Sequence, residues 1–285
     1  MSSQESKNTV YTQETAPTQY IAVDGVKYAY RSFGQKEGIP LVFFIHFVAT
    51  MDDWDPALIN PLAEKYPIVL VDNKGVGGSG GTTPTSVEEM GDDVVKIIRA
   101  LGHEKINLLG FSIGGFIAQH VAANYPDLVD KLILAGTSPK GGKYIPDILQ
   151  HVENARKEEP TNPRLSLFFP KTESGRAAGL AYTERLQRRK KDDRVPPFTQ
   201  EAIANQAQAI IRFGTENDSF SVIRSIKQPT LIVNGDNDTM VATSNSLDFV
   251  QNIPNSKLVI WSDSGHGALY QYHEDFVKEI NEFLK

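Results

Sequence analysis

Short apolar runs recur along most of the chain and predict the strands of a buried sheet. Six of these runs are continuous and do not alternate with polar residues: 41–45, 68–71, 106–109, 132–135, 231–233 and 258–260. Such runs are typical of a parallel sheet covered on both faces. Two further runs within 20–30 flank Asp24 and Gly25, a dipeptide that favours a hairpin. The pattern predicts two antiparallel strands followed by a mostly parallel sheet.

Helical periodicity lies between the apolar runs. The clearest helix begins after Ser86, where Ser86 and Glu89 form a capping box, and it stops at Gly102. Further helices are expected directly after Ser112, over about 244–253 and over 273–284. Strands that alternate with helices predict a doubly wound α/β fold.

The alternation stops between about 138 and 228, where amphipathic stretches and prolines occur without a convincing strand. Connections in α/β units are usually about 2–6 residues long, so an insertion of this length favours a helical lid over a pocket. We therefore predict a lid over 138–228 and a core domain over 19–137 and 229–285. The polar residues 1–18 are expected to be a flexible tail, and the basic run 185–191 a solvated helix face.

Charge and composition narrow the possible partners. The net charge of -6 argues against nucleic acid and anionic membranes, and no apolar run approaches a membrane span. A small-molecule substrate, a cytoplasmic location and a monomer or homodimer are expected. The chain has no cysteine, which excludes disulfides and a cysteine nucleophile. Its six histidines are scattered, so neither a metal nor another cofactor is predicted.

The strongest chemical signal is Gly-Phe-Ser-Ile-Gly at 110–114, directly after one predicted strand and at the start of a helix. A serine on such a strand-to-helix turn is the nucleophile elbow, whose neighbours must be very small. The pattern predicts Ser112 as a nucleophile. The helix start also predicts that the N–H of Ile113 donates to an oxyanion.

A serine nucleophile needs a base and a group that orients the base. Asp238 follows the predicted strand 231–233, and His266 follows 258–260 on a loop with glycine on both sides. Loops at the carboxyl ends of parallel strands face one crevice. We predict His266 as the base and Asp238 as its partner, in preference to Asp236.

These motifs resemble the α/β-hydrolase superfamily, in particular its small esterases, lactonases and haloperoxidase-like members. The stretch 72–79 is similar to the family's D-x-R-G-x-G-x-S turn, with Lys74 in place of the arginine. The resemblance implies an α/β-hydrolase fold with an eight-stranded sheet. It also implies that the N–H of Phe47 is the second oxyanion donor, although His46 stands where the family has glycine.

The sequence thus predicts a serine hydrolase that cleaves esters or lactones of small, mainly apolar substrates through an acyl-enzyme on Ser112. Carbon–carbon bond hydrolases, perhydrolases and small-molecule receptors on the same scaffold remain alternatives. Epoxide hydrolases and dehalogenases need aspartate at the elbow, and proline iminopeptidases usually carry G-G-S-W-G there, so Ser112 and its neighbours argue against both. Besides Ile113, the expected substrate-binding residues are His46, Phe47, Tyr144, Phe168, Phe169 and Met240.

Overall fold

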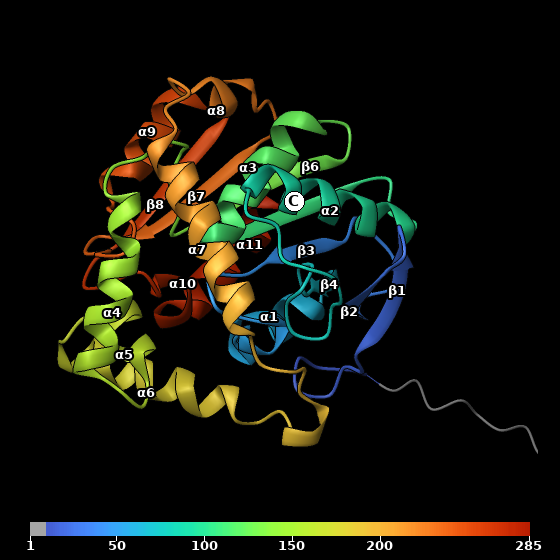
Figure 1. The fold of residues 1–285 in the computed structure, drawn as a ribbon, viewed down its shortest axis with the longest axis horizontal. Helices are drawn as coiled ribbons and strands as arrows, with labels where there is room; N and C mark the ends of the chain where they lie inside the picture. The colour runs from blue at the N-terminus through green and yellow to red at the C-terminus, as the bar shows by residue number, and fades with distance from the viewer. Residues whose placement is uncertain (1–9) are drawn as a thin grey trace, which may run out of the picture.

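One sheet of eight strands organises the protein, which we describe over residues 10–285 from a computed structural model (Figure 1). The strand order is β1-β2-β4-β3-β5-β6-β7-β8. Strand β2 runs antiparallel to both β1 and β4, and every other neighbouring pair is parallel. This confirms the predicted mostly parallel sheet. The strands are β1 (Gln19–Val23), β2 (Val26–Gly34), β3 (Leu41–Phe44), β4 (Pro67–Val71), β5 (Ile106–Phe111), β6 (Val129–Ala135), β7 (Thr230–Gly235) and β8 (Ser256–Trp261).

Helices cover both faces of the sheet, as a doubly wound fold requires. Apolar side chains from α2, α3, α8 and α9 form one core with one face, and α1, α10 and α11 form a second core with the other. Strand β3 serves both cores, because its successive side chains point to opposite faces. None of the helices over residues 10–285 is long and apolar enough to cross a membrane. The helices named here are α1 (Pro56–Ala63), α2 (Val87–Ala100), α3 (Ile113–Asn124), α8 (Ser221–Ser225), α9 (Ser244–Asn252), α10 (Ala268–Gln271) and α11 (His273–Phe283).

The turn between β1 and β2 has the predicted hairpin geometry. Asp24 and Gly25 have φ angles of 49° and 78°, so both adopt the left-handed conformation that a two-residue hairpin turn needs. Val23 and Val26 face each other across the turn. The dipeptide therefore sets the register of the antiparallel edge.

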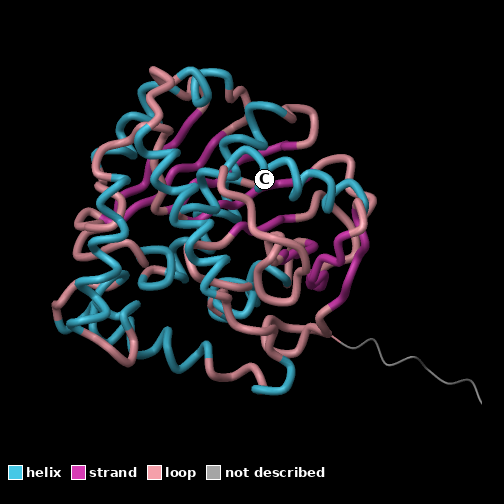
Figure 2. The backbone as a smooth tube through the Cα atoms, viewed as in Figure 1, coloured by secondary structure: helices cyan, strands magenta, loops and turns pink. Residues whose placement is uncertain are grey.

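The long connection between β6 and β7 consists of helices joined by loops, and none of its residues forms a strand (Figure 2). It contains α4 (Ile148–Glu158), α5 (Pro163–Phe168), α6 (Glu173–Leu186), α7 (Gln200–Thr215) and α8. Helices α4, α5 and α6 lie together at one side of the molecule, and α7 returns across the sheet (Figure 1). We call residues 138–228 the helical insertion.

Three ion pairs attach the helical insertion to the loop after β3. Each joins an arginine of the insertion to an aspartate of 52–55, with N···O distances of 3.3, 2.6 and 2.6 Å. The pairs are Arg189 with Asp52, Arg164 with Asp53, and Arg185 with Asp55. The prediction that 185–191 forms a solvated face is therefore wrong for Arg185 and Arg189, because long-range partners bury these two side chains.

The segment before β1 is partly packed against the core. Gln13 and Ala16 are buried, and Gln13 donates hydrogen bonds to the carbonyl oxygens of Met51 and Trp54. Arg189 donates to the carbonyl oxygens of Gln13 and Ala16. The expected flexible tail over 1–18 is therefore wrong for this stretch, whereas its first nine residues lie outside the described part of the chain.

Candidate active site

Ser112 occupies a strained turn between β5 and α3. Its φ of 58° and ψ of -122° place it in a conformation that L residues rarely adopt. Close backbone contacts explain the neighbouring glycines. A Cβ atom on Gly110 would lie 2.4 Å from the carbonyl oxygen of Gly114, and one on Gly114 would lie 2.0 Å from the carbonyl oxygen of Phe44. The sequence thus lets strand and helix meet closely enough to present the serine at the carboxyl end of the sheet.

His266 and Asp238 form a buried pair beside this turn. They lie on the loops after β8 and β7, and His266 Nδ1 is 2.8 Å from Asp238 Oδ2. The other carboxylate oxygen, Oδ1, accepts hydrogen bonds from the backbone N–H groups of Met240 and Val241. Because a carboxylate only accepts, Nδ1 of His266 carries a proton, and Nε2 is the ring nitrogen left to act as the base.

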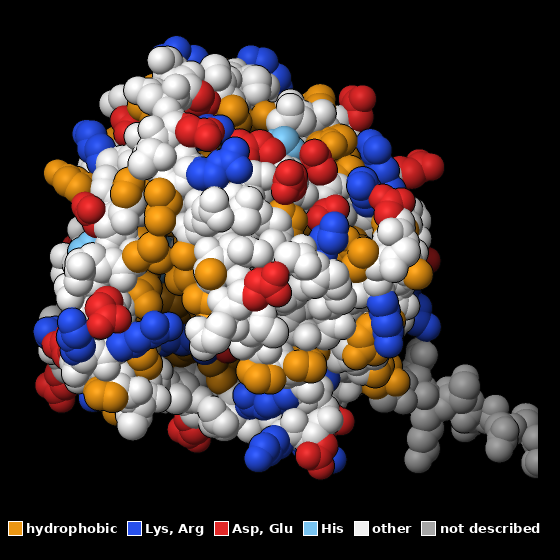
Figure 3. Space-filling model, in the orientation of Figure 1, with side chains coloured by type: hydrophobic (Ala, Val, Ile, Leu, Met, Phe, Trp, Pro, Cys, Tyr) orange, Lys and Arg blue, Asp and Glu red, His pale blue; other side chains and the backbone are white. Residues whose placement is uncertain are grey.

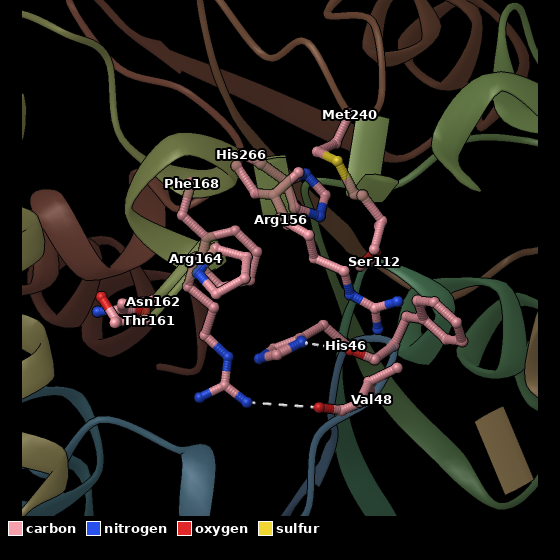
Figure 4. A pocket seen from close by; sticks show the side chains of 14 residues that line it. His46, Val48, Ser112, Arg156, Thr161, Asn162, Arg164, Phe168, Met240 and His266 are labelled. Atoms are coloured by element: carbon pink, nitrogen blue, oxygen red, sulfur yellow. Dashed lines mark hydrogen bonds between the residues drawn. The ribbon is translucent and has the colours of Figure 1, made fainter. Parts of the chain in front are cut away.

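Ser112 and His266 open into one cavity of about 330 Å³, a volume typical of ligand sites (Figure 4). On the surface, hydrophobic side chains surround a hollow beside α4, with basic side chains at its edge (Figure 3). The other lining residues of the cavity come from the loop after β3, from α4, α5 and the turn between these two helices, and from the loop after β7. They are His46, Phe47, Val48, Val152, Arg156, Thr161, Asn162, Pro163, Arg164, Leu167, Phe168 and Met240.

Phe168 links the helical insertion to the histidine loop. Its ring stands edge-on to the rings of both His46 and His266, with centroids 5.0 and 5.5 Å apart. Its carbonyl oxygen accepts a hydrogen bond from the N–H of Gly267 at 2.8 Å. The insertion therefore both forms part of the cavity wall and contacts the loop that carries His266.

Two residues expected at the substrate site lie elsewhere. Tyr144 is 64% exposed and does not line the cavity. Phe169 is buried, but it packs against Tyr182 and Gly179. Phe168 ends α5 and Phe169 begins the extended backbone after it, and only Phe168 of the Phe-Phe pair lines the cavity.

The loop that follows β3 lies over the start of α3. A Cβ atom on Gly114 would lie 2.0 Å from the carbonyl oxygen of Phe44 and 2.8 Å from that of Ile45, so this loop and the elbow touch. Phe47 lines the cavity, and Ile113 is the first residue of α3, where N–H groups have no partner within the helix. The N–H of Val48 donates to Gln206 Oε1 in α7 at 3.2 Å. The two predicted oxyanion donors thus belong to adjoining segments.

His46 is a buried, neutral side chain of the cavity wall. Its Nδ1 atom lies 2.9 Å from the carbonyl oxygen of Phe47, while its Nε2 atom is buried without a hydrogen-bond partner among residues 10–285. Burial, with Arg164 nearby, lowers the pKa of His46 to about 3. The ring therefore presents an unused acceptor near neutral pH.

The turn at 72–79 is joined to the loop after β3 by a hydrogen bond. Asp72 accepts hydrogen bonds from the N–H of Met51 at 2.8 Å and from the N–H of Gly78 at 2.9 Å. Ser79 donates its hydroxyl to the Asp72 carbonyl oxygen and accepts from the N–H of Ala29. Burial raises the pKa of the Asp72 carboxyl to about 7. Lys74 lies 3.5 Å from Asp93.

Sequence reasoning missed the two arginines that line the cavity. Arg164 forms a 2.6 Å ion pair with Asp53, whereas Arg156 reaches the cavity from α4 (Figure 4). No local signal distinguishes them from the many surface arginines of a helical insertion. Within residues 10–285, no group of three or more histidine, aspartate or glutamate side chains is arranged to hold a metal ion.

Comparison with known proteins places this site in a family. The sequence matches the alpha/beta hydrolase fold family over residues 40–271. The structure is similar to that of an alpha/beta hydrolase fold protein from Chitinophaga pinensis, with a TM-score of 0.93, 41% identity and coverage of 96% of this chain and 99% of that chain.

Two curated relatives align over most of their length. A proline iminopeptidase of Pestalotiopsis fici is 27% identical over 94% of this chain and 99% of its own. A putative esterase/lipase of Haemophilus influenzae is 25% identical over 91% of this chain and 88% of its own. With the family match covering most of the sequence, the chain belongs to the alpha/beta hydrolase family.

Proposed function

We propose that this protein is a serine esterase that cleaves carboxylic esters or lactones of small, mainly apolar substrates. The proposal rests above all on one arrangement: Ser112 on its strained turn opens into the same cavity as His266, which is paired with buried Asp238. A serine hydroxyl is a weak nucleophile until a base is within reach, and the Asp–His pair supplies that base.

The reaction follows from these positions. His266 Nε2 takes the proton of the Ser112 hydroxyl, and the serine oxygen attacks the ester carbonyl. The N–H groups of Phe47 and Ile113 donate to the oxyanion as it forms. His266 then gives the proton to the leaving alcohol. Water, activated by the same base, attacks the acyl-enzyme and releases the acid and free serine.

The cavity walls favour an ester with an apolar part. Val152, Leu167, Phe168 and Met240 contribute apolar surface next to the nucleophile. The name of the Haemophilus relative agrees with ester hydrolysis. The Pestalotiopsis relative is named as an iminopeptidase, but this chain has Phe111 and Ile113 on either side of the serine in place of the usual glycine and tryptophan.

Hydrolysis of p-nitrophenyl esters with acyl chains from two to eight carbons tests the proposal. The parent protein should release p-nitrophenol, and Ser112→Ala should lose at least about 10³-fold in kcat/KM while its circular dichroism spectrum stays unchanged. Ser138→Ala is the matched control, because Ser138 is also buried but donates its hydroxyl to the carbonyl oxygen of Pro139 outside the cavity. This variant should retain the parent's activity.

Absence of p-nitrophenol release from the folded parent would contradict the ester assignment. The same panel should then include vinylogous diketones, peroxide-dependent halogenation and an amino-terminal prolyl amide. Turnover of one of these that depends on Ser112 would assign the nucleophile to that chemistry. Thermal stabilisation by a ligand without turnover would indicate a receptor.

A further inference from the structure

The cavity carries positive charge, although the chain as a whole has a net charge of -6. Its fourteen lining residues include two arginines and neither aspartate nor glutamate. The charge of Arg164 is balanced by Asp53 at 2.6 Å, and His46 is neutral because burial lowers its pKa to about 3. Arg156 is therefore the cation of this wall whose charge is not balanced.

The acidic residues around Arg156 are paired with other cations. Glu153 lies 3.4 Å from Lys157, Glu158 pairs with Lys171, and Glu159 pairs with Arg176. Within residues 10–285, the side chain of Arg156 has no ion pair or hydrogen bond. Its guanidinium group thus keeps all its donors free.

The position of Arg156 on α4 directs it toward the substrate. Val152, one helical turn earlier, lines the same cavity, so the two residues share a face of the helix. Figure 4 shows the Arg156 side chain extending into the cavity that contains Ser112 and His266. Apolar Leu167, Phe168 and Met240 contribute other parts of this wall. A ligand that reaches from the serine to Arg156 therefore combines an apolar chain with an anionic end.

We propose that Arg156 binds a carboxylate of the substrate, so that the preferred substrates are esters with a second, free carboxylate at the far end of a short apolar chain. The planar guanidinium matches a carboxylate with two parallel hydrogen bonds. One unbalanced positive charge matches a monoanion, whereas a phosphate monoester carries nearly two negative charges at neutral pH. This inference rests on the proposed function and names its substrate class.

A pair of substrates of equal acyl length tests the inference. We would compare kcat/KM for mono-p-nitrophenyl adipate with that for p-nitrophenyl hexanoate. The parent should favour the adipate by about tenfold or more at low salt, because hydrogen bonds to charged groups are the stronger kind. In Arg156→Gln the ratio should fall toward one, mainly through KM. Lys65→Gln, which removes an exposed positive charge outside the cavity without freeing an acidic neighbour of Arg156, should keep the parent's ratio.

Binding without turnover separates this inference from the ester assignment. Calorimetric titration of the Ser112→Ala protein with monomethyl adipate and with methyl hexanoate should show tighter binding of the adipate. Adding Arg156→Gln should remove the difference, and 0.5 M NaCl should reduce it. Equal binding of the two ligands, or equal weakening of both by Arg156→Gln, would overturn the carboxylate site. If the parent cleaves no ester, the proposed function fails, and the titration alone decides on Arg156.

Discussion

His46 donates a hydrogen bond from Nδ1 to the carbonyl oxygen of Phe47, the residue next to it, at a distance of 2.9 Å. A donor on Nδ1 leaves the lone pair of a neutral ring on Nε2, which is buried without a partner among residues 10–285. Only 4% of this residue is exposed. His46 stands where the family has glycine, and protonation of its buried ring costs free energy because the charged form would lose its contact with water.

This relationship predicts an acid-dependent loss of stability. The folded-state pKa of His46 is about 3, below the ordinary histidine value of 6.5, so the unfolded chain binds more protons between these values. The free energy of unfolding should fall as the pH drops below 6.5, by about 2 kcal/mol at pH 5 from this residue. Urea unfolding at pH 7.5 and pH 5 should show a smaller loss in His46→Gln than in the parent. An equal loss in both, with His151→Gln as the control, would contradict a neutral buried ring.

Asp238→Asn should abolish most of the activity while the fold remains intact. The amide oxygen can still accept from the N–H groups of Met240 and Val241, but its NH2 group would then face His266 Nδ1. The ring would carry its proton on Nε2 and lose its ability to accept the serine proton. A fall of about 10³- to 10⁴-fold in kcat is expected from the equivalent change in serine proteases.

Asp236→Asn is the control for that experiment. Asp236 is exposed on the same loop, and its carboxylate accepts a hydrogen bond from the N–H of Ser264. Its kcat should stay within a few-fold of the parent's. If Asp236→Asn reduced kcat as much as Asp238→Asn, the assignment of Asp238 would be wrong.

Gly114→Ala should damage both the elbow and the loop above it. The new Cβ atom would lie 2.0 Å from the carbonyl oxygen of Phe44, and neither backbone segment can move without displacing Phe47 or Ser112. We expect a loss of about 2–3 kcal/mol in the free energy of unfolding and reduced kcat in the protein that remains folded. Gly80→Ala, whose Cβ would have its nearest neighbour at 3.6 Å, should change neither quantity measurably.

Arg185→Gln should destabilise the attachment of the helical insertion. Arg185 donates two hydrogen bonds to Asp55, whose carboxylate is fully buried and would lose its cationic partner. Breaking such a pair costs about 3–5 kcal/mol. Chemical unfolding monitored by tryptophan fluorescence would measure this loss. Arg188→Gln, an exposed neighbour in the same basic run, should change stability by less than about 0.5 kcal/mol.

Local sequence signals were sufficient to predict the strands of the sheet. They also placed Ser112, Asp238 and His266 after strands β5, β7 and β8. The continuous apolar runs marked the parallel strands, because a strand covered on both faces has no polar side. Asp24-Gly25 fixed the hairpin, and small residues marked the turn at Ser112. These features depend on backbone geometry within a few residues of each signal.

Side-chain partners far apart in the sequence were not predictable in this way. The burial of Arg189 depends on Asp52 and on carbonyl oxygens near the N-terminus, which lie more than 130 residues away. The direction of Tyr144 and Phe169 depends on how the helical insertion packs. The unpaired charge of Arg156 depends on its acidic neighbours, which form ion pairs with other cations.

The three aspartate–arginine pairs at the loop after β3 have a consequence for the path of the substrate. A hinged movement of the helical insertion away from the sheet would separate all three pairs together, along with the Phe168–Gly267 hydrogen bond. These four contacts hold the helical insertion against the core domain. The hollow beside α4 is already open at the surface (Figure 3), so we expect substrates to enter there and the width of this opening to limit which of them reach Ser112.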